Sequence, residues 1–173
     1  MADTTAPQER LQPALLDRLT DEEPDKKVEP REARVLSKRK LRESVLRDLA
    51  WLFNATQLEA VQPLARSPLV RKSVVNFGLP ALSGNTASSL DITDLTRAVR
   101  DAILTYEPRI LPSTLEVRTL LEGGDLDHHN VVGVEIRAML WAQPVPLEFL
   151  VRTDFDLETG KVQITDLVSP RVA

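Results

Sequence analysis

The chain has 173 residues, 42% of them apolar, and its 22 Lys and Arg against 26 Asp and Glu give a formal net charge of −4. These values predict a soluble, weakly acidic globular domain with a tail, and they argue against nucleic-acid binding driven by overall charge. The absence of cysteine excludes disulfides, zinc-thiolate sites, iron-sulfur clusters and thiol nucleophiles. No stretch is apolar enough for a membrane-spanning helix, and residues 1–10 lack the apolar core of a signal peptide, so we expect a cytoplasmic protein without membrane insertion.

Residues 1–37 carry many charges of both signs and four prolines, a composition that predicts a flexible N-terminal tail. Leucines spaced four residues apart within it predict a short amphipathic helix over residues 11–19, which is marginally stable on its own. Two interpretations stay open for its apolar residues Leu15, Leu16 and Leu19. The helix folds back on the core of the same chain, or it is a docking peptide that becomes ordered on a partner.

One apolar stripe, with charged residues lying off it, predicts a helix from Leu41 to Phe53 that ends at Asn54. Ser37 has the side chain of an N-cap, but the basic residues that follow it would crowd the positive end of the helix dipole, so we expect the regular helix to begin near Leu41. The basic run over residues 38–42 is interpreted first as a solvated helix entrance, then as a surface for an acidic partner, and last as a nucleic-acid site.

Two more helices are expected before the strands begin. Ser67-Pro68 is a cap and first-turn pair, and it predicts a short helix that runs through Val75. The spacing of apolar residues from Ile92 to Tyr106 predicts a longer helix, which must end before Pro108.

Beyond this point the apolar period changes to two residues, which predicts strands over about residues 115–121, 132–140, 147–155 and 162–164. Short connections with turn glycines favour antiparallel pairing, and the preceding helices supply the cover that the apolar face of the sheet needs. We therefore predict an α+β fold, with the N-terminal helices packed on one face of a mainly antiparallel four-stranded sheet in two layers. This single domain spans residues 38–166, and a C-terminal tail follows over 167–173.

Glu107-Pro108-Arg109 is the most unusual local arrangement in the sequence. Pro108 disfavours helical backbone at the residue before it, so Glu107 and Arg109 lie two apart on a rigid extended segment and point the same way. The carboxylate and the guanidinium would then project side by side and bind a matching Arg and carboxylate of a partner. The simpler alternative is a helix stop, in which Arg109 caps the last carbonyls of the helix and Glu107 faces solvent.

Potential metal ligands gather in the loop Asp125, Asp127, His128, His129 and Asn130. A solvated hairpin tip accounts for these residues better than a metal site does. The acids over residues 154–158 resemble part of a calcium loop, but its glycine and twelfth-position acid are not matched, so a hairpin turn is expected. No nucleophile elbow, phosphate loop or dinucleotide fingerprint is present, and we predict no catalytic residue, metal site or cofactor.

Five segments carry a family resemblance: PALLDRL at 13–19, LRESVLRDLAWL at 41–52, SVVNFGLP at 73–80, YEPRI at 106–110 and WAQP at 141–144. Together and in this order they resemble the TssE family of type VI secretion baseplate wedge components. That family is similar to the lysozyme-like wedge protein of contractile phage tails. The resemblance implies an assembly protein without hydrolase activity, despite the lysozyme-like label.

The partners that this resemblance implies are the wedge subunits TssF and TssG, the sheath subunits TssB and TssC, and other baseplate components such as TssK. The protein would then be located in the cytoplasm, at the membrane-docked baseplate. Glu107, Pro108 and Arg109 become the wedge-docking element, and an exposed strand edge over residues 161–164 joins the first sheath ring. The alternatives are a muralytic hydrolase, which uses Glu107 or Asp154 with a second acid, and a regulatory adaptor that binds one soluble protein.

Overall fold

The computed structural model describes residues 14–20, 25, 37–81, 92–120 and 131–168. The longer elements are helices α1 (Leu15–Leu19), α2 (Lys38–Phe53), α3 (Pro68–Arg71) and α4 (Ile92–Tyr106) and strands β1 (Glu116–Leu120), β2 (Val131–Leu140), β3 (Leu147–Asp156) and β4 (Val162–Asp166). Three short 3-10 helices lie between them: η2 (Leu58–Ala60), η3 (Val74–Asn76) and η4 (Pro112–Thr114). Within the described part of the chain, no helix combines the length and the apolarity needed to cross a membrane.

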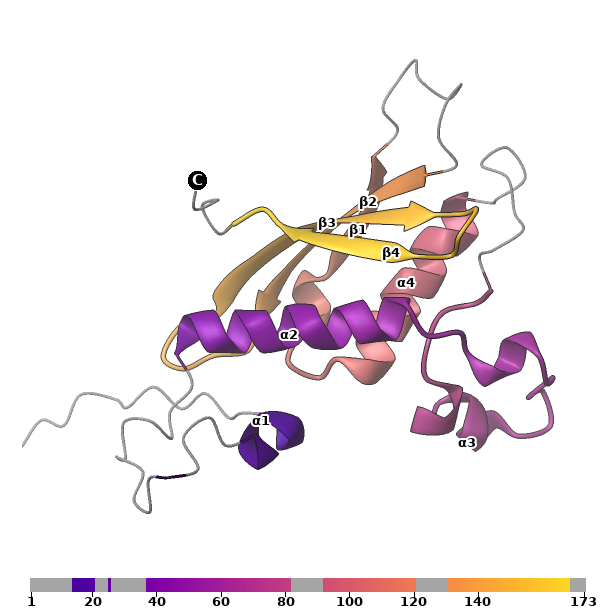
Figure 1. Ribbon diagram of the computed structural model, residues 1–173, viewed down its shortest axis with the longest axis horizontal. Helices are drawn as coiled ribbons and strands as arrows, with labels where there is room; N and C mark the ends of the chain where they lie inside the picture. Colours follow the sequence, from indigo (N-terminus) through magenta and orange to yellow (C-terminus); the bar gives the residue numbers. More distant parts are fainter. Residues whose placement is uncertain (1–13, 21–24, 26–36, 82–91, 121–130, 169–173) are drawn as a thin grey trace, which may run out of the picture.

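The four strands form one antiparallel sheet in the order β1-β2-β3-β4, so each strand pairs with its neighbour in the sequence. Helices α2 and α4 contact each other, with α2 beside β4 and α4 beside β1 (Figure 1). Residues of both helices and of the sheet share one hydrophobic core. The predicted α+β fold, with helices on one face of a four-stranded sheet in two layers, is confirmed.

The core lies between the two long helices and one face of the sheet. Alternate residues of β3, from Phe149 to Phe155, are buried, as the two-residue period of a strand requires. Val45 on α2 and Val99 and Ile103 on α4 are fully buried in the same cluster. Removal of this apolar surface from water is the main term that holds the two layers together.

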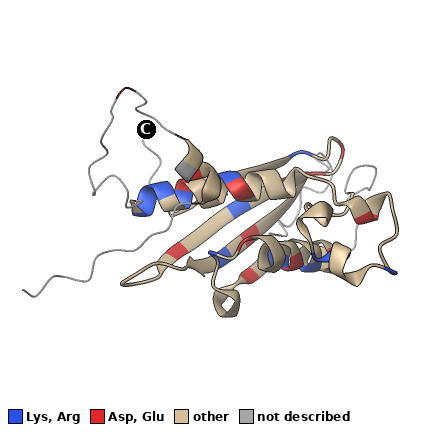
Figure 2. Ribbon diagram, turned by 90° about the horizontal axis from the view of Figure 1, so that it is seen from below, with Lys and Arg blue, Asp and Glu red and all other residues tan. Residues whose placement is uncertain are grey.

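The start of α2 differs from the expectation drawn from its charges. Ser37 Oγ accepts a hydrogen bond from Lys40 N at 3.1 Å, and the helix begins at Lys38 rather than near Leu41. The basic side chains at this end, blue in Figure 2, are exposed, so water screens their repulsion from the helix dipole while the cap satisfies an N–H. At the other end, the predicted terminator Asn54 is confirmed as the C-cap.

The short helix expected from Ser67 through Val75 is divided into two pieces. Helix α3 ends at Arg71, and η3 follows as a separate turn. Between them, Ser73 Oγ donates to Val70 O at 2.8 Å and accepts from Val75 N at 3.3 Å. The hydroxyl therefore replaces hydrogen bonds that a continuous helix would make with its own backbone.

Residues 58–76, which comprise η2, α3 and η3, are called the α3 corner below. The buried side chain of Asn76 ties its parts together, because Oδ1 accepts from Glu59 N at 2.9 Å and Nδ2 donates to Arg71 O at 3.0 Å. The hydroxyl of Tyr106, at the end of α4, lies 3.0 Å from Ser73 O and 2.8 Å from Asn76 O. The α3 corner is thus attached to the end of α4, next to the predicted docking residues.

Candidate functional site

The chain turns sharply after α4, and Glu107, Pro108 and Arg109 form this turn. The N–H of Glu107 donates to Ile103 O at 2.9 Å, as in a helix, and Pro108 then ends the helix as predicted. Arg109 O accepts from Trp141 N at 2.7 Å, just beyond β2. The turn is therefore attached to both α4 and the sheet, which gives its side chains defined positions.

Glu107 and Arg109 bind each other. Nε of Arg109 donates to Oε1 of Glu107 at 2.7 Å, its Nη2 donates to Oε2 at 2.5 Å, and its backbone N–H donates to Oε1 at 3.1 Å. Glu107 is 4% exposed and the side chain of Arg109 is 17% exposed. The prediction that both groups project toward a partner is therefore wrong, and so is the alternative with Glu107 in solvent. An unpaired charge is costly to bury, and here the carboxylate and the guanidinium each supply the opposite charge that the other needs.

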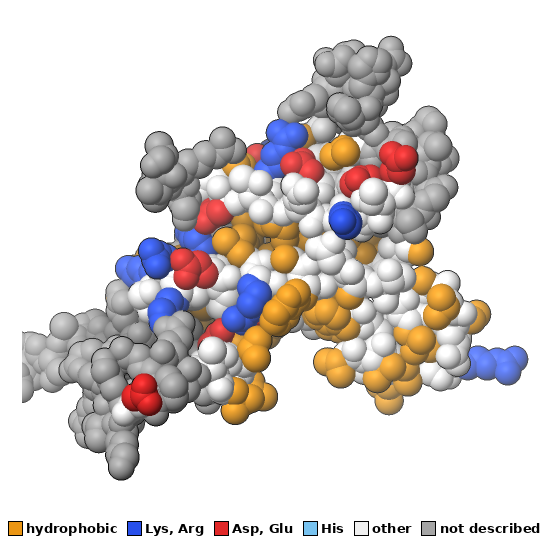
Figure 3. Space-filling model, in the orientation of Figure 1, with side chains coloured by type: hydrophobic (Ala, Val, Ile, Leu, Met, Phe, Trp, Pro, Cys, Tyr) orange, Lys and Arg blue, Asp and Glu red, His pale blue; other side chains and the backbone are white. Residues whose placement is uncertain are grey.

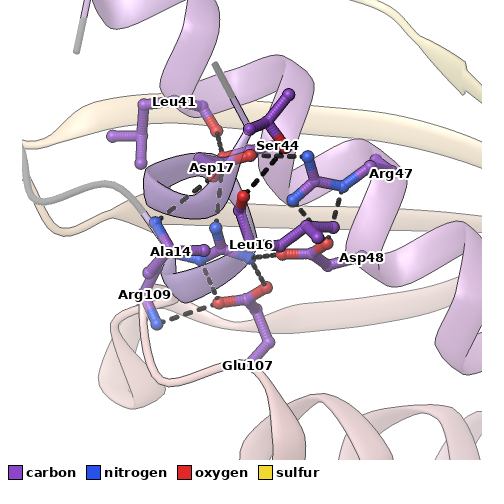
Figure 4. A network of polar contacts seen from close by, with 10 residues as sticks. Ala14, Leu16, Asp17, Leu41, Ser44, Arg47, Asp48, Glu107 and Arg109 are labelled. Atoms are coloured by element: carbon purple, nitrogen blue, oxygen red, sulfur yellow. Dashed lines mark hydrogen bonds and ion pairs between the residues drawn. The ribbon is translucent and has the colours of Figure 1, made fainter.

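Arg109 also reaches α2, where it binds two more side chains (Figure 4). Its Nη2 donates to Oδ2 of Asp48 at 2.5 Å, and its Nη1 donates to Oγ of Ser44 at 3.1 Å. Ser44 in turn donates to Leu41 O at 2.9 Å. Burial lowers the pKa of Arg109, but the hydrogen bonds and charges of Glu107 and Asp48 outweigh burial and raise that pKa above its ordinary value. The guanidinium stays charged and fastens α2 to the turn.

The same network continues to α1 through Arg47. Nε of Arg47 donates to Oδ1 of Asp48 at 2.9 Å, and its Nη1 donates to Oδ1 of Asp17 at 2.6 Å. The bond to Asp17 is the largest of the effects that raise the pKa of Arg47, and burial opposes it. Charged side chains of alternating sign therefore connect α1 to the turn after α4, in the order Asp17, Arg47, Asp48, Arg109 and Glu107 (Figure 4).

A groove of about 420 Å³ opens beside this network. Its lining is mostly apolar and consists of Ala14, Leu49, Trp51, Leu52, Phe77, Tyr106 and Pro108, with Asp48, Glu107 and Arg109. Trp51 is 54% exposed, and Phe77 meets Tyr106 edge-on with ring centroids 5.3 Å apart. Figure 3 shows hydrophobic side chains on both sides of the hollow between α1 and α3. An apolar groove with charged groups at one side suits the apolar side chains of a partner helix.

Helix α1 turns its leucines away from the protein. Leu15 is 73% exposed, Leu16 43% and Leu19 74%, whereas Asp17 faces Arg47. The helix therefore lies against its own chain, as one of the two interpretations expects, but it does so through a carboxylate and not through its apolar residues. Residues 11–13 of the predicted helix lie outside the described residues. The predicted role of the leucines in partner docking stays a prediction.

The remaining acidic candidates lie elsewhere. Asp154 pairs with Arg152 at 3.0 Å on β3. Asp156 accepts from Glu158 N at 2.9 Å, and its backbone N–H donates to Lys161 O at 2.9 Å, so the expected hairpin turn is confirmed. The potential ligands at 125–130 lie outside the described residues, and among the residues that are described no cluster of three metal-ligating side chains occurs.

The basic run at the start of α2 divides into two parts. Residues 38–40 are exposed, as expected for a solvated helix entrance. Arg42 is partly buried instead, because its Nη1 pairs with Asp166 at 3.2 Å and its Nη2 donates to the carbonyl of Glu148. Arg42 therefore holds α2 against β3 and β4, a structural role that the sequence pattern did not indicate.

The sequence pattern also did not single out Ser44, Arg47 and Asp48 as members of the site. Arg47 and Asp48 lie off the apolar stripe of α2, but a polar position on a helix does not reveal a partner 61 residues further along the chain. Ser44, Arg47 and Asp48 lie in a segment that carries the family resemblance, and so do Phe77 and Tyr106. Their aromatic rings now form one wall of the groove.

A family model described as baseplate wedge protein gp25 matches residues 39–145, more than half of the chain. The match contains nearly all of α2, the α3 corner, α4, the turn at Glu107 and β2, and it ends before β3. No curated protein and no solved structure gives a significant match. The matched region thus includes every groove residue except Ala14. The chain belongs to the family of the baseplate wedge protein gp25.

Proposed function

We propose that this chain is a structural component of a type VI secretion baseplate that links the TssF and TssG wedge to the first ring of the TssB and TssC sheath. Membership of the baseplate wedge family supports a structural role in a baseplate. The five ordered segments that resemble the TssE family support the type VI assignment, and with it a cytoplasmic position at the membrane-docked baseplate, near components such as TssK. The docking role is supported mainly by the apolar groove beside Glu107, Pro108 and Arg109.

In this proposal, TssF and TssG supply a helical element whose apolar side chains enter the groove. Trp51 is the principal anchor, because a half-exposed indole loses the most apolar surface when a partner covers it. Glu107 and Arg109 act mainly as positioning residues, since their ion pair and the bond to Asp48 hold the turn and α2 at a fixed separation. A groove that is preorganised in this way binds with a smaller loss of conformational entropy.

The leucines of α1 extend the same interface. Ala14 lines the groove, so a helix seated there passes next to α1 and meets Leu15 and Leu19. Exposed leucines grouped on one short helix form an apolar patch, which differs from apolar residues scattered singly over a surface. The ion pair between Asp17 and Arg47 keeps this patch beside the groove.

The sheath joins at the edge of β4. Asp156 N donates to Lys161 O, so the N–H and C=O of Lys161 point toward β3. Because these groups alternate in direction along a strand, the backbone N–H and C=O of Val162 and Ile164 point away from β3. The outward N–H and C=O of Val162 already bind the side chain of Asn54 at 3.0 Å each. Main-chain pairing with a sheath strand therefore centres on Ile164, in the part of the edge that Asn54 does not cap.

Co-expression with TssF and TssG, followed by size exclusion, tests the docking role. We expect the wild-type chain to co-elute with both subunits and Trp51→Asp to be lost from the complex, because a charge in the groove opposes burial. Val145→Asp is the matched control, since Val145 is 62% exposed in the turn between β2 and β3 and does not line the groove. Wild-type recovery of TssF and TssG by Trp51→Asp, with unchanged thermal unfolding, would remove the groove from the interface.

The muralytic alternative needs a carboxyl group that is open to a substrate. Both oxygens of Glu107 are bound by Arg109, and Asp154 pairs with Arg152, so we propose no enzymatic role. Zymography on peptidoglycan tests this, and clearing that is lost in Glu107→Gln would favour the enzyme. Co-purification from native cells tests the adaptor, which would recover one soluble protein and neither wedge nor sheath subunits.

A further inference from the structure

The α3 corner exposes four large aliphatic side chains. Leu69 is 86% exposed, Val61 81%, Val74 79% and Val75 62%. Figure 3 shows hydrophobic side chains gathered over this corner. Apolar side chains that are exposed as a group, rather than scattered singly, are typical of interaction surfaces.

The backbone that carries these side chains is held in a defined shape. The 5% exposed side chain of Asn76 joins η2 to α3, and the hydroxyl of Ser73 bridges α3 and η3. Tyr106 adds a bond from α4 to the backbone of η3. Because these bonds fix the corner, the aliphatic groups stay outward together, and a partner that covers them loses little entropy in ordering them.

The corner is locally basic in an acidic chain. Residues 58–76 contain three bases, Arg66, Arg71 and Lys72, and one acid, Glu59, within a chain of net charge −4. Arg71 pairs with Glu59 at 2.7 Å, and Arg66 and Lys72 are exposed in the same corner. In Figure 3 a basic side chain borders the corner and no acidic side chain lies over it. Charge complementarity therefore calls for an acidic ligand.

We propose that the α3 corner is a docking surface for an acidic amphipathic helix of a protein partner. The apolar face of that helix covers Leu69 and Val74, and carboxylates at its flank meet Arg66 and Lys72. A second copy of this chain fits less well, because a symmetric pair would bring the two basic corners together. A lipid surface fits less well too, since residues 58–76 contain no aromatic side chain to anchor at a membrane interface. The surface goes beyond the proposed function, because wedge docking at the groove does not require it.

Two synthetic helical peptides are the probes. Both carry leucine at two positions of each heptad, and they differ only in having glutamate or lysine at the flanking positions. Titration of the whole ¹⁵N-labelled chain, followed by NMR, should show shifts at the amides of residues 58–76 with the glutamate peptide, and binding at least about tenfold weaker with the lysine peptide. The variant Leu69→Ser/Val74→Ser should weaken binding of the glutamate peptide by about tenfold or more. Val145→Ser should leave it unchanged, and thermal unfolding confirms that each variant is folded.

Several results would overturn the proposal. They are equal binding of the two peptides, no binding of the glutamate peptide, shifts confined to the groove, or full binding by Leu69→Ser/Val74→Ser. Dimerisation in sedimentation that Leu69→Ser abolishes would assign the corner to a second copy of the chain. Stronger binding to phosphatidylcholine vesicles that contain phosphatidylserine would assign it to lipid. Each of these results leaves co-elution with TssF and TssG, which depends on Trp51, unaffected.

Discussion

Arg109 and Asp48 lie 61 residues apart in the sequence, and Nη2 of Arg109 is 2.5 Å from Oδ2 of Asp48. Arg47 donates to the other oxygen of the same carboxylate at 2.9 Å and also donates to Asp17 of α1. The carboxylate of Asp48 is thus where the turn after α4, helix α2 and helix α1 are connected. The shape of the groove depends on this connection.

Arg109→Ala should lower the free energy of unfolding by about 3 kcal/mol, because it leaves Glu107 buried without its cation. The effect is measured by urea denaturation. Arg118→Ala is the control and should unfold like the wild type, because Arg118 is 70% exposed where it pairs with Glu116. Equal stability of the two variants would show that the buried ion pair does not support the fold. Because Arg109→Ala should also be less stable, any loss of TssF and TssG binding by this variant has to be compared with its fraction of folded protein.

Asp17→Asn should release α1 while leaving α2 intact. The ion pair with Arg47 is partly buried, with side chains 16% and 32% exposed, and its loss should speed amide exchange at Thr20, whose N–H donates to Leu16 O, by about fivefold. Hydrogen-exchange mass spectrometry measures this. Asp94→Asn removes the carboxylate of a more exposed pair with Arg97 on α4 and should not change exchange in α1. Unchanged exchange in Asp17→Asn would mean that other contacts hold the helix.

Ile164→Pro and Gln163→Pro should separate sheath pairing from stability. The N–H of Gln163 faces β3 opposite Asp154, so its loss should cost about 3 kcal/mol in thermal unfolding. The N–H of Ile164 faces away from β3, so Ile164→Pro keeps the ladder bonds and loses only the core packing of a partly buried side chain. It should therefore cost less than Gln163→Pro and, in the proposed assembly, stop TssB and TssC from assembling on the baseplate. Sheath assembly at the wild-type level with Ile164→Pro would exclude this edge as the joining site.

Gly78→Ala should lower the free energy of unfolding by more than about 2 kcal/mol. Gly78 has a φ of +128°, and a Cβ there would lie 2.4 Å from the backbone oxygen of Ala55. Gly133→Ala is the control, because its Cβ would lie 3.4 Å from the nearest atom, on Leu120, and should cost less than about 1 kcal/mol. Chemical denaturation of the two variants measures the difference, and similar costs would contradict this account of Gly78.

Thr159→Val should raise the pKa of Asp156. The hydroxyl of Thr159 donates to Oδ2 of Asp156 at 2.6 Å, and this bond is the largest of the effects that lower that pKa. A carboxyl group with a lowered pKa stabilises the fold at pH values above its ordinary pKa of about 3.9. This contribution is lost as the pH falls through the pKa of the folded state. In Thr159→Val the loss should therefore occur at a higher pH. A ¹³C NMR titration of the carboxyl group measures the change, and an unchanged pKa would remove the hydroxyl as its cause.

The sequence by itself determined the layers of the fold and the family. The apolar spacing of 92–106 and the alternation of 147–155 predicted α4 and β3 because each pattern directly reports which face of an element is buried. Pro108 predicted the end of α4 for an equally local reason, since proline cannot continue a helix. The five ordered segments indicated the baseplate wedge family, which the family match supports.

Only the tertiary structure decided which polar groups meet. From spacing alone, Glu107 and Arg109 should point side by side toward a partner, but α2 covers the turn and brings Ser44 and Asp48 to Arg109. In the same way, α1 has the leucine spacing of a core helix, yet Asp17 is the residue that attaches it. A hydrophobic pattern is a property of consecutive residues, whereas the free energy of a charge depends on whatever lies within a few ångströms of it in space, and that is set only when distant segments pack together.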